Sequence, residues 1–241
     1  MKKNNTWFNR IFRLLFIITL CAAYSMQTVS QPLVLVRHDA FVSYYDCSVH
    51  NPACVVWVLS PSAFSGNLKS SSRHFKTDTK LPVPRVQDKD FKGTGYVRGH
   101  LCPAGDRDSN KKLLKETYLT SNLSPMTMVC NSGPWKMVED SCRALALSHG
   151  NLLISSGPLF LNCDTISCGR KKIVVPSAFW KMAVCLNHPD ESWVWVVPNS
   201  QSLQNPSRIS PSVLRRLVPS ILISEGVFDN VLAIPSKKYP Q

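Results

Sequence analysis

The chain has 241 residues, a length that suits one large domain or two small ones with a substantial buried core. Hydrophobic residues make up 44% of it and charged residues only 18%, which excludes an intrinsically disordered chain and a coiled coil. The formal net charge of +13 indicates a polyanionic partner, either nucleic acid or an anionic surface.

The first 25 residues have the pattern of a secretory signal peptide. They contain four basic residues, Lys2, Lys3, Arg10 and Arg13. The apolar run that follows, residues 14–23, is shorter than the roughly 20 residues of a transmembrane helix and ends in small residues. We therefore expect residues 1–25 to be cleaved, leaving residues 26–241 as a periplasmic or secreted domain. An uncleaved membrane anchor is the alternative, because Ile11 and Phe12 lengthen the apolar segment.

Loss of that segment would lower the formal charge from +13 to +9 and leave eight of the nine cysteines. An even number of cysteines in an exported protein predicts disulfide bonds. Two pairs are close in sequence, Cys47 with Cys54 and Cys163 with Cys168, and turn-forming residues lie between the partners. We expect these local pairs first among the possible pairings. The chain has no CxxC motif, which argues against a structural zinc site.

The first half of the mature chain contains one clear strand pattern. Residues 55–59, VVWVL, predict a buried strand, and the polar, proline-containing residues 60–95 predict loops. A short helix is expected over residues 111–117. Apolar residues spaced by three or four over 134–147 predict an amphipathic helix, with Pro134 in its first turn.

Three strand patterns and a helix follow. The strands are expected at residues 152–155, 179–186 and 193–197, and the helix within residues 208–222. Strands and helices do not alternate regularly, which favours an α+β fold over a doubly wound one. We expect a central, mostly antiparallel sheet flanked by helices, in a single domain, because no interval has the composition of a linker.

The densest group of reactive side chains lies at residues 95–108, GYVRGHLCPAGDRD. Within it, His100 is a candidate general base and Arg98 offers a planar fork for phosphate. Asn131 and Glu139 are eight residues apart, which on one helix places them about 80° from each other. Two such oxygen ligands suit a hydrated Mg²⁺ ion. An imidazole, a hydrated cation and an arginine are sufficient for phosphodiester hydrolysis.

Three segments together resemble the DNA/RNA non-specific endonucleases. They are YVRGHLCPAGD at 96–106, TYLTSNLSP at 117–125 and NSGPWKMVE at 131–139. The resemblance continues from residues 73–78 to residues 197–199, nearly the whole mature chain. It implies a ββα-metal active site and a family with secreted bacterial and mitochondrial members.

The resemblance assigns the reaction to three residues. His100 would be the general base that takes a proton from the attacking water. Asn131 would be the direct protein ligand of a divalent cation, Mg²⁺ or alternatively Mn²⁺. Glu139 would hold water bound to that cation. Asn131 is also suited to cap the helix that Pro134 begins.

The same resemblance gives three further residues supporting roles. Arg98 would contact the phosphate or its developing negative charge. Asn122 would fix the geometry of the active site. Arg73, on a looser alignment, would be a further substrate-binding residue that contacts phosphate.

One position departs from the family pattern, whose motif usually begins with aspartate in DRGH. Here Val97 takes that place, and valine can neither hold metal-bound water nor orient the adjacent arginine. Two hypotheses follow. The chain is an exported, metal-dependent endonuclease that hydrolyses DNA and RNA, or a catalytically weak or inactive nucleic-acid-binding module of the same fold. The retention of His100, Asn122, Asn131 and Glu139 favours the enzyme.

Overall fold

A computed structural model describes residues 33–66, 68, 74–161, 164–168 and 171–218. The predicted signal peptide, Arg73 and Cys163 lie outside these residues. No helix in the described part of the chain is both long and apolar enough to cross a membrane.

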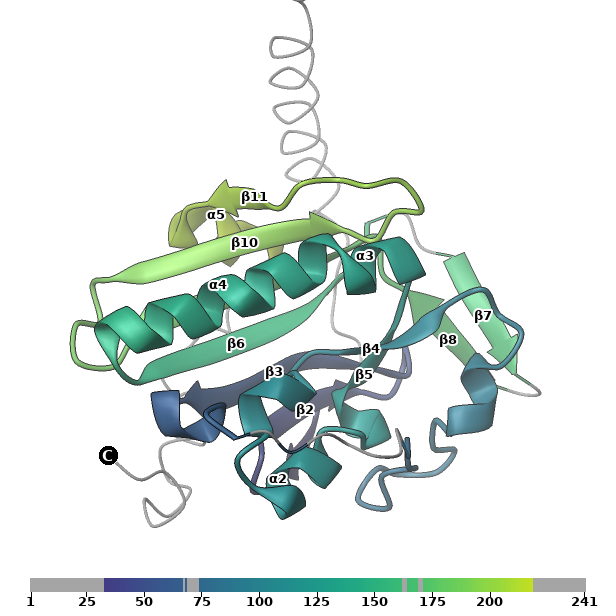
Figure 1. The fold of residues 1–241 in the computed structure, drawn as a ribbon. Coiled ribbons are helices and arrows are strands. Elements are labelled where there is room, and N and C mark those ends of the chain that lie inside the picture. The colour runs from purple at the N-terminus through teal and green to yellow at the C-terminus, as the bar shows by residue number, and fades with distance from the viewer. Residues whose placement is uncertain (1–32, 67, 69–73, 162–163, 169–170, 219–241) are drawn as a thin grey trace, which may run out of the picture.

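Seven strands form one antiparallel sheet, part of which is labelled in Figure 1. Their order is β1-β2-β3-β6-β9-β10-β11. These strands are β1 (Val34–Arg37), β2 (Val42–Asp46), β3 (Asn51–Leu59), β6 (Leu152–Leu159), β9 (Ala178–Cys185), β10 (Ser192–Pro198) and β11 (Ser207–Ile209). Every residue of β6 is buried, because the centre of the sheet is covered on both faces. Strands in that position read as continuous apolar runs, and the VVWVL of β3 is such a run.

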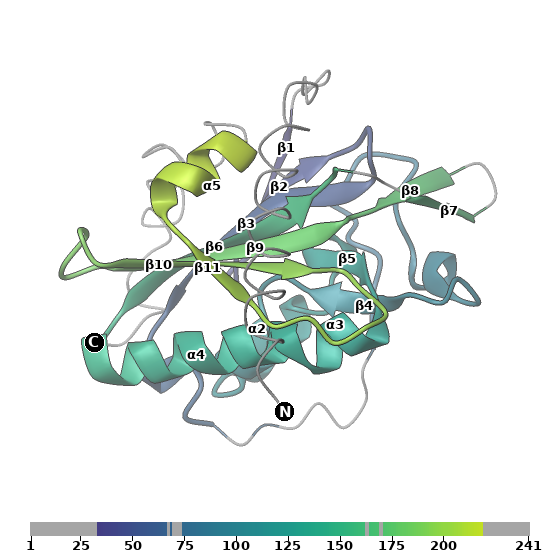
Figure 2. The same cartoon turned by 90° about the horizontal axis from the view of Figure 1, so that it is seen from above.

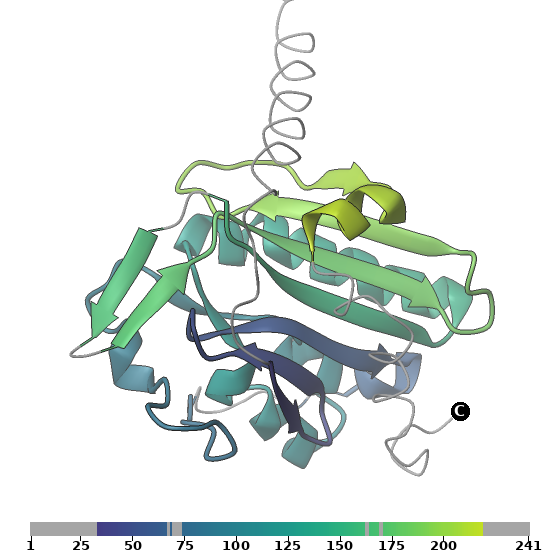
Figure 3. The ribbon, with the colours of Figure 1, turned by 180° about the vertical axis from the view of Figure 1, so that it is seen from behind.

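Two helices cover opposite faces of the sheet (Figure 2). On one face, α4 (Pro134–His149) packs its Trp135 against Trp57 and Phe179. On the other, α5 (Pro211–Leu217) buries Leu214 among strand residues, and Figure 3 shows this face. Each large apolar side chain buried in these layers contributes roughly 1.5–3 kcal/mol relative to its exposed state. The predicted α+β architecture is confirmed.

Helix α4 forms where the spacing of apolar residues predicts an amphipathic helix. In α4, Trp135, Val138, Cys142 and Ala146 recur at intervals of three or four residues and are all buried. The helix ends before Gly150, whose φ of 79° is a conformation that favours glycine. Trp135 is fully buried in the core, as its place in this pattern predicts.

Two short strand pairs lie outside the large sheet. The first joins β4 (Val97–His100) to β5 (Leu123–Met126), and the second joins β7 (Asp164–Cys168) to β8 (Lys171–Val175). The other helices within the described residues are η2 (Pro61–Ala63), η3 (Asp88–Phe91), η4 (Ala104–Arg107), α2 (Lys111–Glu116), η5 (Thr120–Asn122) and α3 (Met128–Ser132). The order β4, β5, α3, α4 gives the ββα arrangement that the sequence predicts.

The predicted disulfide between Cys47 and Cys54 is wrong. No disulfide joins them, and none involves the four other cysteines whose side chains are described, Cys102, Cys130, Cys142 and Cys185. Cys54 packs with Tyr44 in one hydrophobic cluster, whereas Cys47 packs against a different cluster that contains Tyr45. The two thiols therefore lie in separate parts of the core. The second local pair stays a prediction, because Cys163 is outside the described residues.

Close contact between β3 and β6 makes Gly157 sensitive to substitution. A Cβ at this position would lie 2.3 Å from the carbonyl oxygen of Ala53 and 2.9 Å from Nε1 of Trp180. We predict that Gly157→Ala lowers the free energy of unfolding by about 1–3 kcal/mol, because the backbone of β3 has to move. Urea denaturation measures this change. A loss below about 0.5 kcal/mol would contradict the close approach.

Candidate active site

His100 is the last residue of β4, and neighbouring elements hold both its backbone and its ring. Trp135 Nε1 donates a hydrogen bond of 2.9 Å to the His100 carbonyl, which ties β4 to the first turn of α4. The imidazole meets the ring of Tyr118 edge-on at 5.0 Å between centroids and lies 5.6 Å from the ring of Phe75. Packing against two aromatic rings limits the orientations open to the imidazole.

Asn122 lies at the end of η5, next to His100 across the β4–β5 pair. Its buried side-chain oxygen accepts a hydrogen bond of 2.8 Å from the Cys102 amide. Its amide nitrogen donates to the carbonyls of Cys102 and Thr117, each at 2.8 Å. With both of its polar atoms used, this side chain braces the chain that follows His100 and does not face a ligand.

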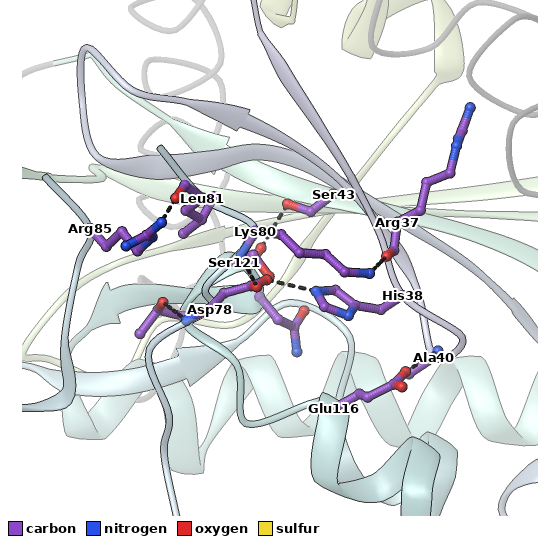
Figure 4. Close-up of polar contacts among 12 residues, drawn as sticks. Arg37, His38, Ala40, Ser43, Asp78, Lys80, Leu81, Arg85, Glu116 and Ser121 are labelled. Carbon is purple, nitrogen blue, oxygen red and sulfur yellow. Dashed lines mark hydrogen bonds and ion pairs between the residues drawn. The ribbon is translucent and has the colours of Figure 1, made fainter. Parts of the chain in front are cut away.

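The residue before Asn122 belongs to a second buried brace, shown in Figure 4. Asp78 accepts hydrogen bonds from the Ser121 hydroxyl and from His38 Nε2, the latter at 2.6 Å. Burial by itself raises the pKa of Asp78, but the hydrogen bonds from His38, from Ser121 and from the Lys80 amide lower it below its ordinary value. The brace fixes the loop before it, and with it Phe75, against η5.

Arg98 is held by a residue that the sequence did not single out. Its Nε lies 2.6 Å from Oδ1 of Asp88, and one of its terminal nitrogens donates to the Asp88 carbonyl at 2.7 Å. The guanidinium also lies over the rings of Phe75 and Phe91, at 5.4 and 5.5 Å. Asp88 belongs to η3, ten residues upstream, and no spacing in the sequence marks it. The carboxylate absent at Val97 is thus supplied to Arg98 from another element.

Asn131 lies in α3, not in the helix that carries Glu139, so the prediction of one continuous helix is wrong. Gly133, with φ −110° and ψ −103°, separates α3 from α4. Asn131 is also not the helix cap that the sequence suggested, because Gly133 holds the N-cap position of α4. Its side chain is partly exposed and makes no hydrogen bond to another described residue. The amide oxygen is therefore open to a ligand.

Glu139 projects from α4 and is partly buried, and its carboxylate makes no hydrogen bond or ion pair within the described chain. Burial raises its pKa to about 7, which Lys181 and Arg143 oppose and Asp106 reinforces. The protein offers the charged carboxylate of Glu139 no hydrogen-bond donor among the described residues to replace the water lost on burial. Its charged form would be stabilised by a cation or by the water bound to one.

Two buried charges, Lys181 and Asp106, and the partly buried Arg143 lie beside Glu139. Lys181 is 1% exposed; its Nζ donates to the Leu101 carbonyl at 3.0 Å and lies over the rings of Trp57 and Trp135. Asp106 accepts from Trp57 Nε1 at 3.0 Å and pairs with Arg143 at 2.7 Å. No sequence pattern marks Asp106 or Arg143, whereas Lys181 is a charged residue inside an apolar strand, which is a signal for an unusual position.

The donor set fits a hard, hydrated cation. Asn131 and Glu139 offer neutral and anionic oxygens, and both side chains lack other hydrogen-bond partners among the described residues. Oxygen ligands in small number are typical of Mg²⁺, which keeps most of its water. No group of three or more His, Cys, Asp and Glu side chains in the described residues is arranged to hold a metal. The last of the predicted site residues, Arg73, lies outside the described chain.

Residues 22–213 match the family of DNA/RNA non-specific endonucleases. The chain belongs to that family. Residues predicted from the resemblance, including His100, Asn122, Asn131 and Glu139, lie inside the matched range.

Individual relatives of this endonuclease-family chain are bacterial and mitochondrial. It is 32% identical over 170 residues to a nuclease of Nostoc sp. (strain PCC 7120 / SAG 25.82 / UTEX 2576), covering 70% of this chain and 60% of the relative. It is 29% identical over 178 residues to the mitochondrial nuclease EXOG of Mus musculus, with 68% and 48% covered. It is 28% identical over 173 residues to the mitochondrial endonuclease G of Bos taurus, with 68% and 57% covered. The chain thus spans about half to three fifths of the length of these relatives.

The fold of this family member is also found in a solved structure. The crystal structure of the EndoG/EndoGI complex contains a chain that matches with a TM-score of 0.68 at 24% identity, covering 83% of this chain and 89% of that one. At that identity the likeness establishes the shared fold.

The raised pKa of Glu139 generates a pH-dependent prediction. The folded pKa of about 7 exceeds the ordinary 4.5, so this group favours folding most when protonated and its contribution is lost as pH rises from about 4.5 through 7. Glutamine stays neutral. We therefore expect Glu139→Gln to raise the free energy of unfolding by about 2 kcal/mol at about pH 8, and hardly at all at about pH 4.

Urea denaturation with a chelator present, at those two pH values, checks this expectation. Asp140→Asn is the matched control on the same helix. The pKa of Asp140 is lowered, since hydrogen bonds from Lys136 and Arg143 outweigh its burial, so this variant should be destabilised at the higher pH. An identical effect of Glu139→Gln at both pH values would show that its carboxylate is not strained.

Proposed function

We propose that this chain is a metal-dependent endonuclease that hydrolyses phosphodiester bonds of DNA and RNA with His100 as general base. The observation that carries the proposal is the placement of His100. Its ring is held by Tyr118 and Phe75 at the end of a strand that also carries Arg98. The membership of the chain in the non-specific endonuclease family supports it.

In this mechanism His100, Arg98 and Asn122 each have one role. His100 accepts the proton of the attacking water, which raises the nucleophilicity of that water. Arg98 faces the phosphate with a guanidinium whose direction Asp88 fixes, so that its charge is in place when negative charge develops. Asn122 keeps the chain after His100 rigid through its three backbone hydrogen bonds.

Asn131 and Glu139 are the residues that would hold a divalent cation. Asn131 would bind it directly through its amide oxygen, and Glu139 would accept hydrogen bonds from its hydration water. When bound, Mg²⁺ or Mn²⁺ supplies positive charge that stabilises the phosphorane-like transition state and the departing 3′ oxygen. The raised pKa of Glu139 supports this role, because a nearby cation would restore its charged form.

Recognition of backbone in place of base or sugar explains why DNA and RNA would both serve as substrates. The formal charge of the chain is +13, and +9 without residues 1–25. Contacts to phosphates depend on such charge and carry no sequence information.

The inactive binding module is the second candidate, and Val97 is the observation in its favour. Valine packs beside the core and cannot direct the neighbouring arginine. Asp88 takes over this task through its ion pair with Arg98. We therefore favour the enzyme.

Export belongs to the proposal and rests on residues 1–25 alone. We propose that this segment is a cleaved leader and that residues 26–241 form one domain that is periplasmic or secreted. The lack of a disulfide among the six described cysteines and the mitochondrial names of several relatives give no support to export. N-terminal sequencing of the protein purified from its native cell decides this, since a start near residue 26 is expected.

The general base is tested by His100→Ala. We expect loss of cleavage by a factor of about 10²–10⁴ on plasmid DNA and on RNA alike, because no other group then takes the proton. His188→Ala, an exposed histidine on a turn, is the matched control and should cleave normally. EDTA should abolish cleavage by the wild-type protein. Undiminished cutting by His100→Ala would sink the mechanism, and no cutting by the wild type with Mg²⁺ or Mn²⁺ would favour the binding module.

The ion pair of Arg98 is tested by Asp88→Asn. Loss of the carboxylate should lower kcat for oligonucleotide cleavage about tenfold, since hydrogen bonds between charged groups are worth about 1.5–3 kcal/mol. Adding Val97→Asp should restore part of that loss by supplying a carboxylate from β4. Asp190→Asn, on an exposed turn, controls for charge. A normal kcat in Asp88→Asn would show that Arg98 needs no partner.

A further inference from the structure

A surface groove of about 520 Å³ is lined by four lysines. We call it the lysine groove; its lining residues are Lys76, Lys111, Lys112, Lys115, Glu116 and Leu119. We propose that it binds phosphates of the nucleic-acid strand that flank the bond to be cut. The inference rests on the proposed function and extends it with a substrate-binding surface.

The groove exists because of how α2 is anchored. Asn110 caps the helix by accepting hydrogen bonds from the amides of Lys112 and Leu113, at 2.9 and 3.2 Å. Leu113 and Leu114 are buried, which turns the lysines of this six-residue helix to solvent. The fourth lysine comes from a distant segment.

Lys76 reaches the groove through backbone pairing. Its amide donates to the Tyr118 carbonyl and its carbonyl accepts from the Thr120 amide, both at 3.0 Å. These bonds place Lys76 opposite Leu119. Lysines 35 to 39 positions apart in sequence are thus brought to one groove.

The charges in the groove are only partly compensated. Lys112 pairs with Asp39, and Glu116 accepts a hydrogen bond of 2.8 Å from the Ala40 amide (Figure 4). Among the described residues, the other three lysines of the groove make no ion pair. All four lysines are exposed. An excess of ammonium groups along an open groove fits a ligand with several negative charges in a row.

The groove adjoins the site through aromatic neighbours. Lys76 follows Phe75, and Leu119 follows Tyr118, and these two rings are the ones that hold His100. Lys76 and Leu119 are thus each one residue away from a ring that holds His100, so the groove and the candidate site are built on the same paired segments of backbone. None of the groove residues is aromatic, so the groove contacts backbone without stacking on bases.

Binding of fluorescein-labelled single-stranded oligonucleotides of increasing length tests this inference. All proteins carry His100→Ala so that the strand stays intact during anisotropy titrations in EDTA. Lys111→Gln/Lys115→Gln removes two charges from α2. Arg215→Gln/Arg216→Gln removes two charges from α5, a similarly short helix on the opposite face of the sheet, and is the matched control.

We expect the α2 pair to weaken binding of long oligonucleotides about tenfold and the α5 pair to change it less than about twofold. The slope of log K against log salt should become shallower by about 0.7 for each lost phosphate contact. Lys76→Gln should act in the same direction. Equal losses in the α2 and α5 pairs, or an unchanged salt slope, would overturn the proposal.

Cleavage by proteins that keep His100 separates this inference from the proposed function. The α2 pair should raise KM for long strands and leave cleavage of the p-nitrophenyl ester of thymidine 5′-phosphate unchanged, because this small substrate does not reach the groove. A protein that cuts nothing but loses strand affinity in the α2 pair contradicts the enzyme and keeps the groove. A normal KM on long strands in an active α2 pair contradicts the groove and keeps the enzyme.

Discussion

The side-chain amide of Asn122 makes three hydrogen bonds to backbone groups of Cys102 and Thr117 and is buried from solvent. Each of those backbone groups would cost about 1–3 kcal/mol if it were buried without a partner. One amide therefore determines where the chain runs after His100 and where α2 ends. Tyr118, which follows Thr117, contacts the imidazole, so the ring of the candidate base depends on the same bonds.

A second constraint is electrostatic. Lys181, Asp106 and Arg143 are charged groups taken into or beside the core, where each is held by hydrogen bonds, an ion pair or aromatic rings. Glu139 lies next to them without such a partner, and its raised pKa reflects the free-energy cost of burying its charged form. Ionisable side chains with shifted pKa values gather where chemistry is done, and they reduce the stability of the fold there.

Local patterns predicted local features well. The spacing of Trp135, Val138 and Cys142 gave the long helix, and the apolar run at residues 55–59 gave a central strand. The motifs around His100 predicted the endonuclease family, because several motifs in one order are specific, and the site residues taken from them stay predictions. The role of Asp88 was not predicted, because tertiary packing determines that it pairs with Arg98. The break between α3 and α4 was not predicted either, because the single residue Gly133 separates the two helices. The strands within residues 34–46 were not predicted, because their apolar residues show no clear two-residue alternation in the sequence.

The free cysteines have a chemical consequence. Thiols react as thiolates, and burial raises the pKa of Cys102, Cys130 and Cys142 to about 12. At neutral pH these side chains are protonated and shielded, so they behave as small apolar residues toward oxidants and alkylating reagents. Packing and hydrogen bonds alone hold these parts of the core together. These three positions therefore keep the same covalent form in a reducing or an oxidising compartment.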